Sequence, residues 1–164
     1  MSNRVITAAE LRFRRDITNM SLPENITLSQ TFDTSADYEI AFTDGIYNGL
    51  SISFELNITD SYPFAPPKVT CKCPIFHPNV CQKSRVVCMN LLRLEWRPTI
   101  DIESIIMCTL YMFLDDTIID LEDALNTDAA EEYRRDKEQF IIKSRQSLIN
   151  FTRPGHSQYL SRCT

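Results

Sequence analysis

Cysteine is the residue type most able to do chemistry in this chain, which has six cysteines and two histidines. A cysteine attacks through its thiolate, so a catalytic cysteine must be reachable and should have positive charge nearby. Cys81 and Cys88 fall in an irregular stretch, with Lys83 and Arg85 between them. These two are the candidate nucleophiles, and composition alone does not choose between them.

The other four cysteines have positions that predict no catalytic role. Cys71 and Cys73 share the apolar face of a predicted strand, and Cys108 lies within a predicted buried helix. Packing in the core explains all three, since free cysteine behaves as a small apolar residue. Cys163 belongs to the C-terminal tail, where no role is evident.

A structural zinc site is the alternative interpretation of the clustered thiols. The candidate ligands fall within 18 positions, namely Cys71, Cys73, His77, Cys81 and Cys88. Structural zinc usually uses pairs of the form Cys-x2-Cys, whereas the close pair here is Cys-x-Cys on a strand and spreads poorly around one ion. We therefore predict no metal site.

Composition bounds the chain to one domain without a nucleotide loop. The 164 residues are 43% hydrophobic and 24% charged, which is ordinary for a globular core. The three glycines, Gly45, Gly49 and Gly155, are scattered, so neither a phosphate loop nor a dinucleotide loop is present. We predict no cofactor.

The charge balance argues against nucleic acid and membrane partners. The net charge is -5, and the densest basic stretch is the short Arg12, Arg14 and Arg15. Those arginines are typical of a solvated helix face or of a docking patch for an acidic protein partner. No apolar run approaches the ~20 residues of a bilayer span, and no secretory signal opens the chain. We expect reduced thiols and a cytoplasmic or nuclear location.

The elements that position the cysteines follow an α+β order. Thr7 and Glu10 form a capping-box pattern that predicts a helix, with an apolar stripe ending near Met20. Four alternating stretches then predict an antiparallel meander. The inward residues of the first two strands are Ile26, Leu28 and Phe32, and then Tyr38, Ile40 and Phe42. In the third strand they are every second residue from Leu50 to Ile58, and in the fourth they are Val69, Cys71 and Cys73. A turn at Asp44–Gly45 separates the second and third strands.

The second half of the chain predicts a long ordered loop followed by helices. Five of the eight prolines lie between Pro63 and Pro78, and no long regular element is expected from there to Pro98. Asp101 caps a helix that is apolar over much of its circumference, so this helix is expected at the centre of the core. A last helix is predicted from Asn126–Thr127 to about Ile149, with Glu131 and Arg135 paired on its exposed face.

Four motifs in a fixed order carry a resemblance to a known family. They are Tyr62–Lys68 with its Tyr-Pro-x-x-Pro-Pro pattern, the tripeptide His77-Pro78-Asn79, Cys88-Met89-Asn90-Leu91-Leu92, and Trp96-Arg97-Pro98. Together they resemble the ubiquitin-conjugating enzyme family over roughly residues 7 to 149. The resemblance implies that family's fold: an N-terminal helix, a four-stranded antiparallel meander, a long active-site loop and C-terminal helices. We predict a single domain over 1–164, with a core of about 7–150 and a tail of 151–164.

Within the family the chain is most similar to the branch that conjugates the ubiquitin-like modifier Rub, the neddylation branch. The similarity lies in Ala8–Arg12 with Leu22-Pro23, in Cys88–Trp96, in Leu125–Glu131, and in a tail with Tyr159 and Arg162-Cys163. It implies an acyltransferase that takes Rub from an activating enzyme and passes it to a lysine, on a cullin-type protein with a RING ligase. The alternatives are a ubiquitin-conjugating enzyme, or a non-catalytic scaffold that binds modifier or ligase.

The resemblance also assigns roles to individual residues. Cys88 would carry the modifier as a thioester. Asn79 would support the oxyanion of the tetrahedral intermediate, or hold the loop that does. Asp123 matches the acidic gate residue that orients the incoming lysine, and His77 and Pro78 are expected to be structural. The ligase-facing positions are Arg12, Phe64, Pro98 and Thr99.

Four departures from the family pattern surround the proposed nucleophile. Cys88 follows Asn79 by nine positions, one more than is usual in the Rub branch. The glycine usually found before the cysteine is replaced within Lys83–Arg85, so a position needing φ > 0 is expected to be lost. The segment 115–123 is longer than the usual gate and lacks its proline. Cys81 is an additional thiol, and a disulfide with Cys88 is conceivable.

Overall fold

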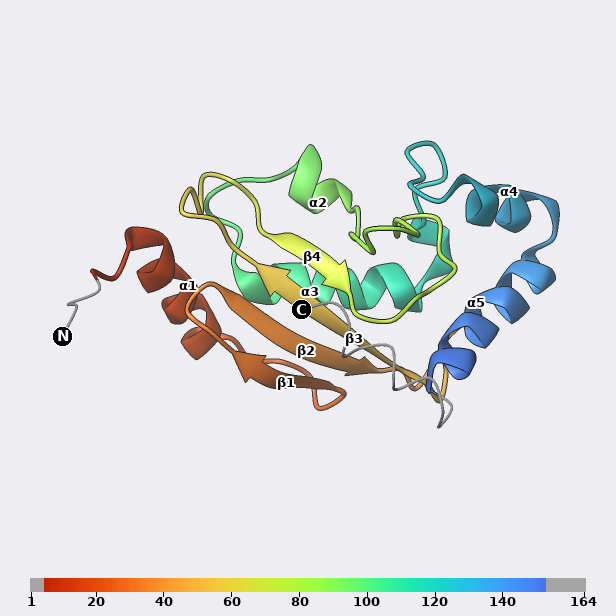
Figure 1. Ribbon diagram of the computed structural model, residues 1–164, viewed down its shortest axis with the longest axis horizontal. Coiled ribbons are helices and arrows are strands. Elements are labelled where there is room, and N and C mark those ends of the chain that lie inside the picture. The colour runs from red at the N-terminus through yellow and green to blue at the C-terminus, as the bar shows by residue number, and fades with distance from the viewer. Residues whose placement is uncertain (1–4, 153–164) are drawn as a thin grey trace.

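The computed structural model describes residues 5–152 as a four-stranded antiparallel sheet with helices on one face and at both ends (Figure 1). The strands pair in chain order, β1-β2-β3-β4. The elements are α1 (Ala8–Asn19), β1 (Ile26–Thr31), β2 (Ser35–Ala41), β3 (Ser51–Asn57), β4 (Lys68–Cys71), α2 (Asn90–Arg93), α3 (Ile102–Leu114), the 3-10 turn η1 (Asp116–Ile118), α4 (Thr127–Arg135) and α5 (Lys137–Thr152). The predicted α+β fold is confirmed. The predicted tail of 151–164 lies outside the described residues except for its first two, which belong to α5.

The first helix begins where the capping box predicts. The Thr7 hydroxyl accepts from the Glu10 N–H at 3.1 Å, and the Glu10 carboxylate accepts from the Thr7 N–H at 2.9 Å. These two bonds satisfy N–H groups that a helix start otherwise leaves without partners. Ala9 and Phe13 are buried on the inner face, so the capped start also fixes which side of α1 faces the sheet.

The core lies between the sheet and α3, which runs along one face of it (Figure 1). Tyr38 of β2 and Phe54 of β3 stack with ring centroids 5.3 Å apart, and Phe113 of α3 meets Phe54 edge-on at 5.3 Å. The buried Tyr38 hydroxyl donates to Thr109 of α3 at 3.1 Å. This hydrogen bond and the ring contacts together hold α3 in one orientation over the sheet.

Phe32 is exposed, against the alternation that placed it on the inner face of the first strand. The register shifts between Leu28 and Gln30, where a bulge inserts one extra residue opposite β2. Because successive side chains point to opposite faces, a shift of one residue turns every later side chain over. Phe32 is accordingly 52% exposed.

The predicted last helix is two helices, α4 and α5. Asp136 between them has extended backbone angles and ends α4, while its carboxylate accepts from the Gln139 N–H in the first turn of α5. The predicted pair of Glu131 with Arg135 is also wrong. Arg135 donates instead to the carboxylate of Glu132 at 2.7 Å, which Lys143 of α5 binds as well. None of the helices in residues 5–152 combines the length and apolar character needed to cross a bilayer.

Gly45 generates a prediction about the packing of the β2–β3 connection against α3. It has φ +73°, and a Cβ there would lie 2.5 Å from the Leu114 carbonyl oxygen; Gly49 has φ +80° but open space around it. We expect Gly45→Ala to lower the free energy of unfolding by about 2–4 kcal/mol, from backbone strain plus the clash.

Gly49→Ala is the matched control, because it carries the strain without the clash. We expect Gly49→Ala to lower the free energy of unfolding by about 1–2 kcal/mol only. Urea unfolding of the two variants measures the difference, and equal losses would contradict the close approach of Gly45 to α3.

Candidate active site

A short hairpin over residues 79–88 holds Cys88. Val80 and Val87 form an antiparallel bridge, and the Cys88 N–H donates to the Asn79 carbonyl at 2.8 Å. The Cys81 N–H donates to Val86 at 3.0 Å. The residue opposite Cys88 is therefore Asn79, which belongs to the His-Pro-Asn tripeptide, while Cys81 faces Val86. Both thiols are free, so the conceivable disulfide is not formed.

Arg85 adopts a left-handed backbone in the stretch where the family resemblance leads us to expect a glycine. Its φ is +58°, so the left-handed conformation is kept although the glycine is gone. The expectation that this position is lost is wrong. Arg85 donates from its backbone to Cys81 at 2.8 Å and from its guanidinium to the Lys72 carbonyl at 2.7 Å. These bonds hold the turn against the end of β4 and offset the backbone strain.

The five described thiols differ in their surroundings. Burial raises the pKa of Cys71 to about 12 and also raises the pKa of Cys73 and Cys108, which keeps these three protonated. Hydrogen bonds from the side chain and backbone of Ser84 lower the pKa of Cys81. Cys88 is half-buried and lines a hollow of about 620 Å³. Cys108, predicted to lie in the core, is half-buried and contributes to the wall of the same hollow.

The side chain of Asn79 is committed to the segment that follows α3. Its amide donates to the Asp120 carbonyl at 2.7 Å and its carbonyl oxygen accepts from the Asp120 N–H at 3.0 Å. The residue is 1% exposed. Of the two roles weighed for Asn79, this arrangement matches the one in which it holds a loop, because both of its polar atoms have partners.

Asp123 is brought next to Cys88 by the same segment. The carboxylate of Asp120 accepts from the N–H groups of Glu122 and Asp123, both at 3.1 Å, which forms a tight turn. The Asp123 carboxylate then accepts from Arg93 at 2.6 Å, and Arg93 also contacts the Cys88 sulfur at 3.4 Å. The longer proline-free segment thus still brings an acidic side chain close to the candidate nucleophile, because both contact Arg93.

His77 and Pro78 lie behind the site and do not face the hollow. His77 is 1% exposed, its Nδ1 accepts from the Asn79 N–H at 3.1 Å, and its ring lies 4.7 Å from that of Phe113. Burial lowers the pKa of His77 to about 3, so the imidazole is neutral at physiological pH. The Pro78 carbonyl accepts from the Asn126 N–H at 2.9 Å. These contacts agree with a structural part for both residues.

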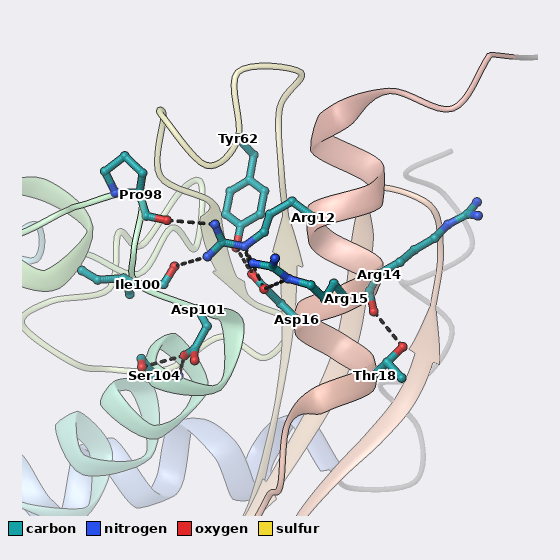
Figure 2. A network of polar contacts seen from close by, with 10 residues as sticks. All are labelled: Arg12, Arg14, Arg15, Asp16, Thr18, Tyr62, Pro98, Ile100, Asp101 and Ser104. Atoms are coloured by element: carbon teal, nitrogen blue, oxygen red, sulfur yellow. Dashed lines mark hydrogen bonds and ion pairs between the residues drawn. The ribbon is translucent and has the colours of Figure 1, made fainter.

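Arg12 joins α1 to the segment before α3 (Figure 2). Its guanidinium binds the Asp16 carboxylate at 2.8 and 3.0 Å and donates to the carbonyls of Pro98 at 2.9 Å and Ile100 at 3.3 Å. The Tyr62 hydroxyl donates to Oδ2 of Asp16, which Arg12 also binds. Burial and then this bond raise the pKa of Tyr62. The guanidinium of Arg12 therefore makes its hydrogen bonds within the chain.

The four predicted ligase-facing positions lie on three segments that this network connects. Pro98 and Thr99 are exposed just before α3, and Phe64 is 81% exposed in the proline-rich loop. The Trp96 indole donates to the Pro63 carbonyl at 2.9 Å, which fixes that loop beside residues 96–98. Phe64 is thus presented outward by a loop that the contacts of Tyr62 and Pro63 hold in place.

Sequence reasoning missed Arg93, Asp120, Asp16 and Tyr62. Arg93 and Tyr62 stand inside quoted motifs, but no spacing rule links them to Cys88 or to Asp16. Asp120 had a usable signal, because an Asp two to three residues before other polar residues is typical of a turn capped by its own carboxylate. Among residues 5–152, no three His, Cys, Asp or Glu side chains converge as metal ligands would.

The structure thus combines a half-buried cysteine beside a His-Pro-Asn tripeptide with a four-stranded meander that one central helix crosses. The family profile described as ubiquitin-conjugating enzyme matches residues 12–148, so the chain belongs to the ubiquitin-conjugating enzyme family. The family and fold predictions are confirmed, as is the prediction of a conjugating enzyme.

Similar proteins come from the neddylation branch. The NEDD8-conjugating enzyme UBC12 of Saccharomyces cerevisiae is 39% identical over 135 residues, which are 77% of this chain and 70% of that protein. The NEDD8-conjugating enzyme Ubc12 of Dictyostelium discoideum is 36% identical over 85% of this chain, which spans 60% of that protein. The solved structure of S. cerevisiae Ubc12 superposes with a TM-score of 0.73 at 35% identity, covering 87% of this chain and 80% of that one.

The buried neutral His77 predicts acid sensitivity. Its folded-state pKa lies below the unfolded value of about 6.5, so the unfolded chain takes up the proton first and stability falls as pH drops from about 6.5 toward 3. Between pH 7 and pH 5 this residue should cost about 2 kcal/mol of unfolding free energy. In His77→Gln the drop measured by urea unfolding should be smaller by that amount; an unchanged drop would contradict a neutral His77.

The Asn79 contacts predict a local loosening when the amide is removed. In Asn79→Ala the Asp120 N–H loses its acceptor, and we expect its hydrogen exchange to accelerate by about fivefold, since one such bond contributes about 1 kcal/mol. Asn25→Ala is the control, because Asn25 makes a comparable bond to Ala41 at 3.0 Å. Equal exchange at Asp120 in both variants would refute the loop-holding contact.

Proposed function

We propose that this chain conjugates the ubiquitin-like modifier Rub, called NEDD8 in the names of its relatives, through a thioester on Cys88. The observation that carries the proposal is the setting of Cys88. Its sulfur opens on a hollow, accepts a hydrogen bond from a guanidinium at 3.4 Å, and lies beside a fixed Asn79. The similarity to enzymes with NEDD8-conjugating names supports the choice of modifier.

The loading step exchanges one thioester for another. The Cys88 thiolate attacks the carbonyl carbon of the modifier's C-terminal acyl group, which is bound to a cysteine of the activating enzyme. The new C–S bond forms, the old one breaks, and the activating enzyme's cysteine leaves as a thiolate. No ATP is needed at this step, because the acyl group arrives already activated.

The transfer step forms an amide. The neutral amine of a substrate lysine attacks the thioester carbonyl, the C–S bond breaks, Cys88 leaves as a thiolate and the amine proton passes to solvent. Asp123 attracts and orients the lysine as an ammonium before it loses that proton. Asn79 keeps the loop that carries Asp123 in place, since it binds the backbone of Asp120.

The partners follow from the two steps and from the exposed face next to α1. An activating enzyme supplies the modifier, and a RING-type ligase docks on Phe64, Pro98 and Thr99 and brings a protein, such as one of the cullin type, whose lysine is modified. Arg12 holds the backbone of that face in place through its hydrogen bonds to the carbonyls of Pro98 and Ile100. A free thiol nucleophile needs a reducing compartment, so we place the reaction in the cytosol or nucleus.

A charging assay tests the modifier and the nucleophile together. The chain is incubated with ATP and with NEDD8 or ubiquitin, each with its own activating enzyme, and is analysed on a non-reducing gel. We expect an adduct with NEDD8 that thiols cleave. The adduct should be lost in Cys88→Ala and retained in Cys81→Ala, the matched control from the same hairpin.

The other outcomes decide between the remaining functions. A faster adduct with ubiquitin than with NEDD8 would assign the chain to ubiquitin conjugation. No adduct with either modifier, together with binding to a RING ligase, would support the non-catalytic scaffold. Loss of the adduct in Cys81→Ala but not in Cys88→Ala would reverse the choice of nucleophile.

A further inference from the structure

Arg93 contacts both the proposed nucleophile and the proposed gate residue with one guanidinium. Its Nη1 donates to the Cys88 sulfur at 3.4 Å and its Nη2 donates to the Asp123 carboxylate at 2.6 Å. The side chain is 36% exposed and that of Asp123 is 56% exposed, so both groups can be reached and moved. The bonds to Asp123 and then to Cys88 raise the pKa of Arg93, which stays a cation.

The short helix α2 explains why Arg93 reaches back to Cys88. The chain turns once over Asn90–Arg93, and the Asn90 carbonyl accepts from both Leu94 and Glu95 at 3.0 Å. Leu92 is buried and anchors this turn to the core. A residue five positions after the cysteine is therefore returned to its sulfur by a single turn with a buried anchor.

Arg93 is the cation in contact with a sulfur whose other charged surroundings are mainly acidic. The titratable groups that line the two hollows beside Cys88 are Glu95, Cys108, Tyr111 and Asp120 in one, and Lys68 and Arg93 in the other, with Asp123 bound to Arg93. Carboxylates near a thiol disfavour its thiolate, whereas a hydrogen-bonded cation favours it.

We propose that Arg93 is a positioning residue which favours the Cys88 thiolate before loading and occupies Asp123 until the acceptor lysine displaces it. The proposal rests on the function proposed above and adds a residue and an order of contacts to it. Before loading, the guanidinium faces a sulfur that becomes negative. After loading, the thioester sulfur carries no charge, so Arg93 keeps only Asp123 as an ionic partner.

The displacement follows from the geometry at Asp123. The acceptor lysine arrives as an ammonium and needs the carboxylate that Arg93 binds at 2.6 Å. Two cations compete for one carboxylate, and the exposed Arg93–Asp123 pair is weak enough to be exchanged. Arg93 thus disfavours small cationic amines that are not brought in by a ligase.

The first experiment needs no modifier and tests the sulfur contact. The rate of Cys88 alkylation by iodoacetamide is followed by peptide mass spectrometry from pH 6 to 10. In Arg93→Gln we expect the Cys88 profile to move to higher pH and the rate at pH 7 to fall by about threefold. Arg93→Lys should recover part of that rate. Cys81 in the same molecule is the internal reference, and the pH profile of its alkylation should not change.

The second experiment tests the competition at Asp123. The preformed thioester is discharged at pH 7 by Nα-acetyl-lysine amide, which is cationic, and by hydroxylamine, which is mostly uncharged. The ratio of the two rates cancels any effect of Arg93 on the leaving thiolate. We expect Arg93→Gln to raise the ratio of the lysine rate to the hydroxylamine rate about twofold or more. In the double variant that combines Arg93→Gln with Asp123→Asn, we expect this increase to be lost.

Arg135→Gln is the control in both experiments, because it removes an exposed arginine that binds a carboxylate at 2.7 Å on α4. The proposal is overturned by a Cys88 profile in Arg93→Gln that superimposes on the wild type, by Arg93→Lys reacting as slowly as Arg93→Gln, or by an unchanged ratio. A wild-type chain that forms no thioester contradicts the proposed function alone, and the alkylation profile then decides the role of Arg93.

Discussion

The pair of hydrogen bonds between the Asn79 side chain and the Asp120 backbone holds the site together. The two residues are 41 positions apart, and neither lies in a helix or a strand. A primary amide donates and accepts at once, which suits it to bind both polar groups of one peptide unit in a buried position. On one side of this pair of bonds, the hairpin that begins at Asn79 carries Cys88. On the other side, the turn that begins at Asp120 carries Asp123.

A second polar cluster holds the opposite end of the segment that starts at Cys88. Arg12 and Asp16 sit one helical turn apart on α1, and both side chains are largely buried. A buried ion pair is tolerated only when its remaining donors and acceptors are satisfied, and here the Pro98 and Ile100 carbonyls and the Tyr62 hydroxyl satisfy them. The chain between Cys88 and Ile100 is therefore fixed at both ends and anchored between them by Trp96.

Local patterns predicted the regular elements well, because capping and alternation depend on neighbours in sequence. The capping box at Thr7, the cap at Asp101 and the four strands in their order match these rules, although β4 ends at Cys71 and does not reach Cys73 as predicted. The failures are equally physical. A bulge after Leu28 reverses the face of Phe32, and Asp136 adopts extended backbone angles that divide one expected helix into two. Neither a bulge nor a single extended residue changes the apolar periodicity.

The sequence by itself determined the family and predicted Cys88 as the nucleophile, because four motifs in a fixed order can be recognised as short stretches of chain before and after Cys88. Only the tertiary structure decided what touches that sulfur. Arg93 reaches it through one turn of helix, and Asp123 approaches through contacts across 30 or more positions. Such contacts depend on how α2 and the segment after α3 pack. Sequence spacing encodes neighbours one turn or one strand pair apart, and it carries no comparable rule for loops that meet only after the core has formed.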